Sequence, residues 1–192
     1  MRLFVDTADL NEIDEWDEHP WVAGFTTNPT LMRNNGDADA RRWAKEVVAL
    51  TDKPVSIDGP PEVWKLGDNV YRKVIDYDHG GGKLNHTAIC HPRQLWGSYS
   101  HSSIISVFCG RIMDTGRNPQ RVIDAARETG AQVLWASVRE PFNIIQADRA
   151  GCDIVTVPPA ILRKYLDWHG KPLEVVADET IAQFERDREG LW

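Results

Sequence analysis

The sequence is poor in features that mark secreted or membrane-spanning proteins. It has only three cysteines, Cys90, Cys109 and Cys152, and their odd number and wide spacing predict a reducing compartment without a disulfide framework. No apolar run approaches the ~20 residues that cross a bilayer. Asp6 interrupts the first apolar run near the N-terminus, which argues against a signal peptide. The sequence therefore predicts a cytoplasmic protein with no membrane partner.

Positive charge is also scarce. The 22 Lys and Arg residues face 29 Asp and Glu residues, which gives a formal net charge of −7. A general nucleic-acid binder normally carries a basic face, so no nucleic-acid partner is expected. A few placed arginines still suffice to bind a phosphorylated metabolite. The length and the 42% hydrophobic content predict one globular domain over 1–192.

Short apolar runs alternate along the chain with amphipathic stretches. Strands are predicted at 3–5, 21–25, 54–57, 69–75, 84–89, 104–108, 132–136 and 153–157. Helices are predicted after the caps Asp9 and Asp37, and at 120–129, 140–148, 159–166 and about 178–189. Eight such units favour an α/β fold, the (β/α)8 TIM barrel. A doubly wound sheet is the competing architecture, but the first turn lacks its usual glycines.

The middle of the chain is short for such a barrel. Barrels typically run to about 250 residues, whereas this chain has 192. Only 76–83 separate two predicted strands, although a parallel crossover normally takes ~10–12 residues or more. The segment 58–68 has room for barely two helical turns. We therefore expect shortened or missing outer helices around strands 3–5, which leaves barrel closure open.

One lysine stands among the polar residues at the predicted strand ends, where barrels carry their active residues. These residues are Asp6, Asn28, Asp58, Lys73, Asn85, Thr87, Ser106, Arg111, Ser137 and Arg139. Burial lowers the pKa of a lysine and leaves an amine that forms Schiff bases with carbonyls. Taken alone, the strand is explained more simply by an edge or surface lysine. Arg72 beside it is expected to face outward and to need solvent.

Acids and arginines at the other strand ends have two interpretations each. Asp6 and Asp58 suit proton transfer in Schiff-base chemistry, whereas helix capping and loop solubility explain isolated acids. Arg111 and Arg139, with a nearby hydroxyl, suit a phosphate. Rim salt bridges with acids such as Asp114 explain the arginines as well. No spacing of His and Cys residues predicts a metal site.

Six ordered blocks of the sequence resemble transaldolases and the related fructose-6-phosphate aldolases. They are Leu3–Asp9, Gly24–Leu31, Leu84–Ala88, Ser103–Ile112, Leu134–Arg139 and Ala150–Pro158. The resemblance implies a TIM barrel of the class I aldolase type that needs neither cofactor nor metal. It also implies a homo-oligomer, because small members of the family usually form rings in which the terminal helix can dock on a neighbour.

The resemblance implies a catalytic role for four positions. Lys73 matches the Schiff-base lysine, and Asp6 matches the acid that assists cleavage and formation of the carbon–carbon bond. Thr87 matches the residue that positions the catalytic water. Asp58 stands where transaldolases have Glu and the aldolases have Gln, so its carboxylate is retracted by one methylene.

Other positions are implied to bind the substrate. Asn28, Asn85 and Ser106 match groups that hold the hydroxyls of a dihydroxyacetone unit. Arg111, Ser137 and Arg139 match the phosphate grip. Phe108 stands where transaldolases carry Phe and the related aldolases carry Tyr, which favours transfer to an acceptor over release of dihydroxyacetone.

These positions together imply a transaldolase of the pentose phosphate pathway. Such an enzyme transfers a dihydroxyacetone unit from fructose 6-phosphate or sedoheptulose 7-phosphate to an aldose phosphate. Two alternatives stay open: a fructose-6-phosphate aldolase-like enzyme, and a non-catalytic sugar-phosphate-binding barrel relative. The shortened segment 58–83 is the feature that favours the non-catalytic relative.

Overall fold

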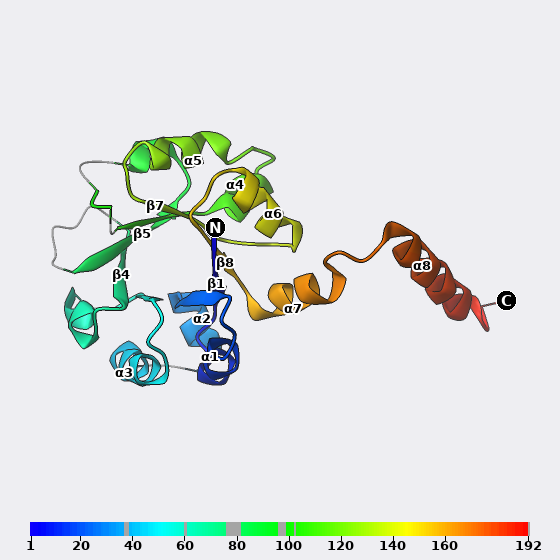
Figure 1. Cartoon of the computed structure of the whole chain (residues 1–192), viewed down its shortest axis with the longest axis horizontal. Helices are drawn as coiled ribbons and strands as arrows, with labels where there is room; N and C mark the ends of the chain where they lie inside the picture. Colours follow the sequence, from blue (N-terminus) through cyan, green and yellow to red (C-terminus); the bar gives the residue numbers. More distant parts are fainter. Residues whose placement is uncertain (37–38, 60, 76–81, 96–98, 102, 192) are drawn as a thin grey trace.

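Eight parallel strands close into one barrel in the computed structural model of the chain (Figure 1). The structure describes residues 1–36, 39–59, 61–75, 82–95, 99–101 and 103–191. Each strand pairs with the next one along the chain, and the last pairs with the first. The strands are β1 (Arg2–Asp6), β2 (Val22–Thr26), β3 (Val55–Ile57), β4 (Val70–Val74), β5 (Lys83–Ile89), β6 (Ile104–Val107), β7 (Gln132–Trp135) and β8 (Ile154–Val157). The predicted TIM barrel is confirmed, and each predicted strand agrees with an observed one to within one residue at either end.

Helices surround the barrel and mostly occupy the predicted stretches. They are α1 (Leu10–Asp17), α2 (Pro29–Asn34), α3 (Ala40–Leu50), α4 (Cys109–Asp114), α5 (Gln120–Arg127), α6 (Phe142–Arg149), α7 (Pro159–Trp168) and α8 (Leu173–Arg188), with the 3-10 helices η1 (Pro61–Leu66) and η2 (Pro92–Gln94). The sequence prediction lacks the short helices α2 and α4, and α8 begins five residues before its predicted start. None of the described helices is long and apolar enough to cross a membrane.

Aspartate caps fix the beginnings of two helices. Asp9 caps α1 as predicted, because its Oδ1 accepts a hydrogen bond from the Asn11 N–H at 2.9 Å. The cap of α3 is Asp39, whose carboxylate accepts from two backbone N–H groups of the first turn. Asp37, the predicted cap, lies outside the described residues. The helix therefore begins two residues later than its predicted cap indicates.

The β3–β5 part of the barrel carries less helix than the rest. After β3 comes only the 3-10 helix η1, and eight residues separate β4 from β5, of which Ile75 and Gly82 are described. These two strands still pair in parallel, from Tyr71–Lys83 to Val74–His86. The expected shortening of the outer helices holds for the described residues, and the barrel closes without them.

The inside of the barrel is filled by an apolar cluster below the strand ends. Phe4, Tyr71, Ile104 and Ile154 belong to this cluster. Each lies two residues before a polar residue near the end of its strand, and residues two apart share one face of a strand. Gly24 makes room for the cluster, because a Cβ there would lie 2.7 Å from the Phe4 ring. This apolar cluster fills the lower part of the barrel interior, so the polar side chains lie above it, at the C-terminal ends of the strands.

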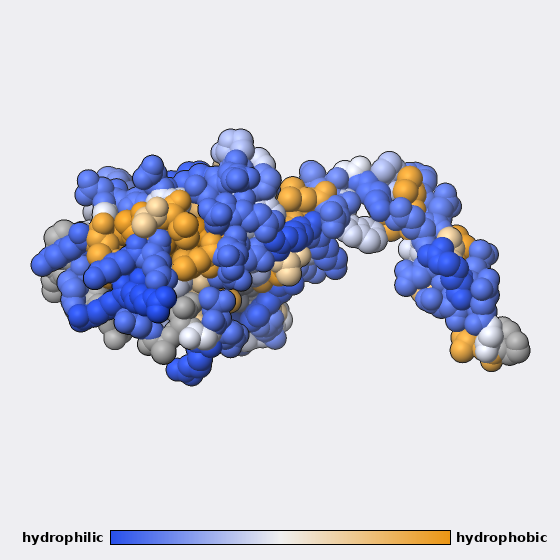
Figure 2. All heavy atoms as spheres, turned by 90° about the horizontal axis from the view of Figure 1, so that it is seen from below, coloured by the Kyte–Doolittle hydropathy of each residue, from blue (hydrophilic) through white to orange (hydrophobic). Residues whose placement is uncertain are grey.

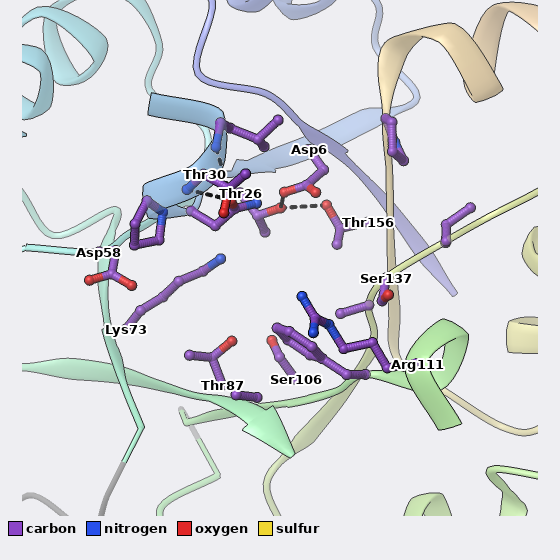
Figure 3. Close-up of a pocket in the computed structure, with 18 of the residues that line it drawn as sticks. Asp6, Thr26, Thr30, Asp58, Lys73, Thr87, Ser106, Arg111, Ser137 and Thr156 are labelled. Atoms are coloured by element: carbon purple, nitrogen blue, oxygen red, sulfur yellow. Dashed lines mark hydrogen bonds between the residues drawn. The ribbon is translucent and has the colours of Figure 1, made fainter. Parts of the chain in front are cut away.

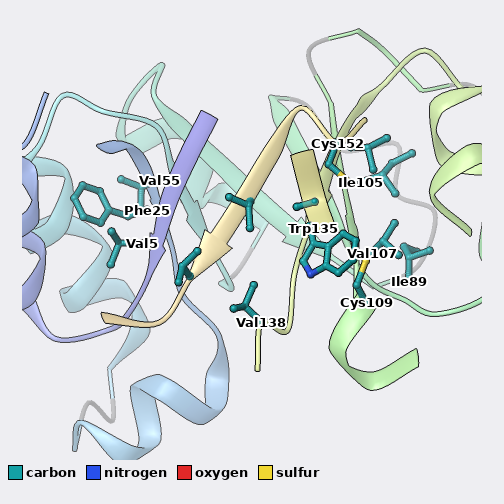
Figure 4. Packing of buried hydrophobic residues seen from close by; sticks show 14 of the residues in the cluster. Val5, Phe25, Val55, Ile89, Ile105, Val107, Cys109, Trp135, Val138 and Cys152 are labelled. Carbon is teal, nitrogen blue, oxygen red and sulfur yellow. The ribbon is translucent and has the colours of Figure 1, made fainter. Parts of the chain in front are cut away.

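A larger core lies between the strands and the helices (Figure 4). Val5 and Phe25 belong to it on one side of the barrel, and Val107 and Trp135 on the other. On β4, Arg72 faces outward as expected but is only 4% exposed. The prediction that it needs solvent is therefore wrong. Its outward neighbours on β4 are buried too, so this face of the strand is covered.

The chain ends in a helical arm that leaves the barrel. Helix α8 projects beyond α7 and away from the strands (Figure 1). Leu173, Ile181 and Phe184 on this helix are 80%, 57% and 58% exposed. Apolar surface is accordingly visible along the arm (Figure 2). A solvent-exposed apolar face of this kind marks a surface suited to protein contacts.

Candidate active site

A pocket of about 410 Å³ at the C-terminal ends of the strands gathers ten of the eleven predicted site residues (Figure 3). They are Asp6, Asn28, Asp58, Lys73, Thr87, Ser106, Phe108, Arg111, Ser137 and Arg139. The eleventh, Asn85, is fully buried behind the pocket wall. Parallel barrels place their active sites at this face, because the loops after all eight strands meet there.

Lys73 extends into the pocket from the fourth position of β4 (Figure 3). Its Nζ donates a hydrogen bond to the backbone carbonyl of Thr27. Burial lowers the pKa of Lys73, although the charges of Asp6 and Asp58 act in the opposite direction. The lysine is thus an interior residue rather than an edge or surface one, and its environment favours the neutral, nucleophilic amine.

Two carboxylates lie near this amine. Burial raises the pKa of Asp6, against the opposing effects of the Lys73 charge and a hydrogen bond from Thr26. Burial also raises the pKa of Asp58, again opposed by Lys73. Asp6 does not cap the first helix, because Asp9 does. A lowered amine pKa and raised acid pKa values bring the groups closer in acidity, which suits proton transfer between them.

The amide and hydroxyl groups differ in how freely they face the pocket. Asn28 lines the pocket and caps α2, with its Oδ1 accepting from the N–H groups of Thr30 and Leu31, so its Nδ2 is the side-chain group that this cap does not use. Asn85 donates to Ser56 Oγ at 3.0 Å and accepts from Ser106 Oγ at 2.7 Å. Asn85 therefore orients Ser106 from behind the wall instead of lining the pocket itself.

The cationic rim depends on a close approach between α4 and the loop after β7. A Cβ on Gly110 would lie 1.8 Å from the carbonyl oxygen of Ser137, so only glycine permits this contact. Ser137 itself has a φ of +63°, in the left-handed region that a side chain rarely adopts. The approach brings Arg111 and Arg139 to one wall of the pocket.

The two arginines have different partners in this structure. Arg139 Nη2 lies 3.0 Å from Asp114 Oδ2, so the rim salt bridge considered for the arginines forms at this position. The Arg111 guanidinium lies 5.7 Å from the centre of the Phe108 ring. Because both partners of the salt bridge are about half exposed, solvent weakens it. An incoming phosphate can therefore compete for Arg139.

Sequence reasoning missed Thr26 and Thr156, which also line the pocket. The hydroxyl of Thr26 lies 2.6 Å from both Asp6 Oδ1 and Thr156 Oγ1. Threonine is common in strands because a β-branched side chain packs well there, so neither residue stands out. The signal that could have found them is strand alternation, because each lies two residues after a residue that faces the inside of the barrel, Gly24 for Thr26 and Ile154 for Thr156.

No group of three or more His, Cys, Asp or Glu side chains suited to a metal ion occurs in the described parts of the chain. A closed parallel barrel with a buried amine, two acids and a cationic rim at its mouth defines a lysine-centred (β/α)8 barrel site. A sequence model of the family described as Transaldolase/Fructose-6-phosphate aldolase matches residues 74–191. The chain belongs to this transaldolase/fructose-6-phosphate aldolase family.

Three relatives of similar length align with nearly the whole of this chain. A probable transaldolase from Thermoplasma volcanium is 32% identical, over 97% of this chain and 95% of the relative. A probable transaldolase from Clostridium botulinum (strain Eklund 17B / Type B) is 29% identical, over 100% and 99%. A third, from Methanococcus maripaludis (strain DSM 14266), is 31% identical, over 98% of each chain. The Clostridium alignment spans 219 positions, so at least 27 of them have no counterpart among the 192 residues here.

Proposed function

We propose that this protein is a transaldolase that transfers a dihydroxyacetone unit from a ketose phosphate to an aldose phosphate through a Schiff base on Lys73. Fructose 6-phosphate and sedoheptulose 7-phosphate are the proposed donors, as in the pentose phosphate pathway. The observation that carries the proposal is the position of the Lys73 amine, whose pKa burial lowers, beside Asp6 and Asp58 in a pocket with a cationic rim.

In the proposed first half-reaction, Lys73 Nζ attacks the keto carbon of the donor, and loss of water gives an imine. Asp58 and Thr87 line the pocket on the Lys73 side and serve the proton and water transfers of this step. Asp6 then accepts the proton of the C4 hydroxyl as the C3–C4 bond breaks. The bonding electrons move into the imine, which becomes an enamine, and an aldose phosphate leaves.

In the proposed second half-reaction, the enamine carbon attacks the aldehyde of the acceptor, and Asp6 returns its proton to the new alkoxide. Water then hydrolyses the imine and restores the Lys73 amine. Arg111, Ser137 and Arg139 hold the phosphate in both halves by charge-assisted hydrogen bonds. Arg139 exchanges Asp114 for the phosphate when substrate binds.

A product analysis separates the proposal from its alternatives. The purified protein is incubated with fructose 6-phosphate, with and without a four-carbon aldose phosphate, and the products are identified by NMR. A transaldolase forms a seven-carbon ketose phosphate only when the acceptor is present. Release of free dihydroxyacetone without acceptor would assign an aldolase. Substrate binding without either product would assign the non-catalytic relative.

A substitution at one position tests the choice between transfer and cleavage. We expect Phe108→Tyr to raise dihydroxyacetone release at the expense of transfer, because a hydroxyl there can protonate the enamine carbon before the acceptor arrives. Phe108 lines the pocket next to Arg111, so the new hydroxyl faces the substrate. An unchanged product ratio would count against the transaldolase assignment within the family.

We also propose that the protein is a homo-oligomer in which α8 packs on another copy. The exposed residues Leu173, Ile181 and Phe184 supply the apolar face of the helix. We expect the double substitution Ile181→Glu with Phe184→Glu to reduce the mass measured by light scattering to that of a monomer. Glu185→Gln, on the same helix, is the matched control and leaves the assembly intact. A monomeric unsubstituted protein would contradict the proposal.

A further inference from the structure

We propose that Thr156 is a positioning residue, which holds the Thr26 hydroxyl as a hydrogen-bond donor to Asp6 so that the carboxylate stays ionised and aimed at the substrate. The inference rests on the proposed function, because Asp6 is taken as the proton acceptor for cleavage. It assigns a part in that step to a residue on β8, which is linked to Asp6 by hydrogen bonds through Thr26 (Figure 3).

The three side chains come from adjacent strands around the point where the barrel closes. Asp6 is paired with Thr26 in the register of β1 with β2, and Thr156 is paired with Phe4 in the register of β1 with β8. Thr26 Oγ1 lies 2.6 Å from Asp6 Oδ1 and 2.6 Å from Thr156 Oγ1. Thr26 is 1% exposed and Thr156 is 4% exposed, so water has little access to this chain of oxygens.

The direction of the hydrogen bonds follows from counting protons. A threonine hydroxyl has one proton, and an ionised carboxylate only accepts. Thr26 gives its proton to Asp6, so the bond between the two threonines requires Thr156 to donate to Thr26. The order is therefore Thr156 to Thr26 to Asp6. This order fits the ionised form of Asp6, and hydrogen bonds in series strengthen one another.

The chain opposes the effect of burial on Asp6. Burial raises the pKa of this carboxyl, whereas the Thr26 hydrogen bond and the Lys73 charge lower it. Lys73, on β4, is the charged group that acts on Asp6, and Asp58, the residue after β3, acts in turn on Lys73. Because burial favours the neutral amine of Lys73, the fixed dipoles of the two threonines gain importance for keeping Asp6 ionised.

Packing alone gives a different expectation for Thr156. If its only role were to fill space in the barrel, valine would replace it without loss, since valine has nearly the same shape. If the hydroxyl matters, Thr156→Val removes the donor that orients and polarises the Thr26 hydroxyl, so the hydrogen bond from Thr26 to Asp6 weakens, whereas Thr156→Ser keeps the donor. The pair of variants therefore separates shape from hydrogen bonding.

The kinetic test compares Thr156→Val, Thr156→Ser and the unsubstituted enzyme in the transfer reaction. We expect Thr156→Val to lower kcat about threefold to tenfold at neutral pH, with little change in KM. The acid limb of its kcat profile should move to higher pH, because Asp6 must lose its proton to act. Thr156→Ser should recover kcat and the pH profile. Equal kinetics for Val and Thr at 156, or a Ser variant as impaired as the Val variant, would overturn the inference.

A second measurement needs no turnover. The carbonyl stretch of a protonated Asp6, identified by its loss in Asp6→Asn, is followed by infrared spectroscopy as the pH is raised. We expect the band to persist to higher pH in Thr156→Val and in Thr26→Val than in the unsubstituted protein. Should Thr156→Val not fold, Thr156→Ala serves the same comparison. An unchanged titration would overturn the role of Thr156.

The kinetic and infrared measurements distinguish an error in the role of Thr156 from an error in the proposed function. An unsubstituted protein that forms no covalent adduct with fructose 6-phosphate overturns the proposed function, while the infrared titration still reports on the threonines. If the enzyme is active but the titration of Asp6 is the same with Thr and Val at position 156, the role of Thr156 is overturned and the proposed function stands.

Discussion

The two sides of this barrel are built very differently although their strands pair alike. On the β6–β8 side, an α-helix follows each strand within a few residues. On the β3–β5 side, η1 follows β3, and eight residues join β4 to β5. Both sides have parallel pairing and an interior filled by apolar side chains. Closure of the barrel thus depends on strand pairing and interior packing more than on a complete outer layer.

The proposed chemistry is divided along the same line. Lys73, Asp58 and Thr87 lie on the β3–β5 side, where the outer layer is thin. Arg111 and Arg139 lie on the helix-covered side. The comparison therefore predicts that substitutions on the first side change the bond-making steps, while those on the second change phosphate affinity.

The largest expected effect separates these two sides by activity. Lys73→Met should reduce turnover by more than about a thousandfold, because no other group forms the imine. Arg111→Gln should keep the lysine adduct but raise KM for the phosphorylated donor about tenfold to a hundredfold. Both are measured by steady-state kinetics, with circular dichroism to show that each variant folds. A Lys73→Met enzyme with normal turnover would refute the division.

A glycine pair tests whether the two sides tolerate added volume differently. Gly110→Ala should raise KM for the donor about tenfold and cost about 1–3 kcal/mol of stability, because its Cβ meets the Ser137 carbonyl oxygen. Gly59→Ala on the other side meets its nearest atom at 3.5 Å, so we expect a change within about 1 kcal/mol. Thermal denaturation and donor kinetics check both. Equal stabilities for the two variants would contradict the expectation.

Truncation of two valines compares the packing of the outer layers. Val107 on β6 is fully buried in the main core, whereas Val74 on β4 is 7% exposed and is not part of that cluster. We expect Val107→Ala to lower the free energy of unfolding by about 2–3 kcal/mol and Val74→Ala by about 1 kcal/mol. Urea denaturation measures both. A larger loss at Val74 would show that the β3–β5 side carries more of the stability than its helices indicate.

The burial of Lys73 should also shift the pH dependence of its chemical labelling, which is a smaller effect. Burial lowers the pKa of Lys73, so its amine loses its proton at a lower pH than that of an ordinary lysine. Labelling of Lys73 by an aldehyde and borohydride should therefore persist to lower pH than labelling of free N-acetyl-lysine in the same solution. Mass spectrometry of the Lys73 peptide and of N-acetyl-lysine at several pH values gives the two profiles. Coincident profiles would show that burial does not shift Lys73.

The fold was predictable because each strand is a short apolar run with turn residues on both sides. The two missed helices, α2 and α4, have six residues each and lie directly at the pocket. Helices that short show less than two turns of periodicity, so hydrophobic spacing does not reveal them. Arg72 was misjudged because a charged side chain on an outward strand position normally implies solvent.

The site was predictable where residues at strand ends also matched the family's motifs, as for Lys73 and the two arginines, whose residue types alone left simpler explanations open. Its threonines were not, since Thr26 and Thr156 acquire their roles only when the barrel closes and brings β2 and β8 to either side of β1. Asn85 shows the opposite error. Its position in the sequence predicts a substrate-binding residue, whereas in the structure it is buried and accepts a hydrogen bond from Ser106. Contacts across the closed barrel decide both cases.

The most direct test of Lys73 as the Schiff-base residue is reductive trapping of the imine. The protein is incubated with fructose 6-phosphate, treated with borohydride and mapped by mass spectrometry, with Lys83→Met as a control for the exposed lysine that begins β5. We expect a dihydroxyacetone-derived adduct on Lys73, kept in the control variant and lost in Lys73→Met. Folded protein without an adduct on Lys73 would show that this lysine does not form the proposed Schiff base.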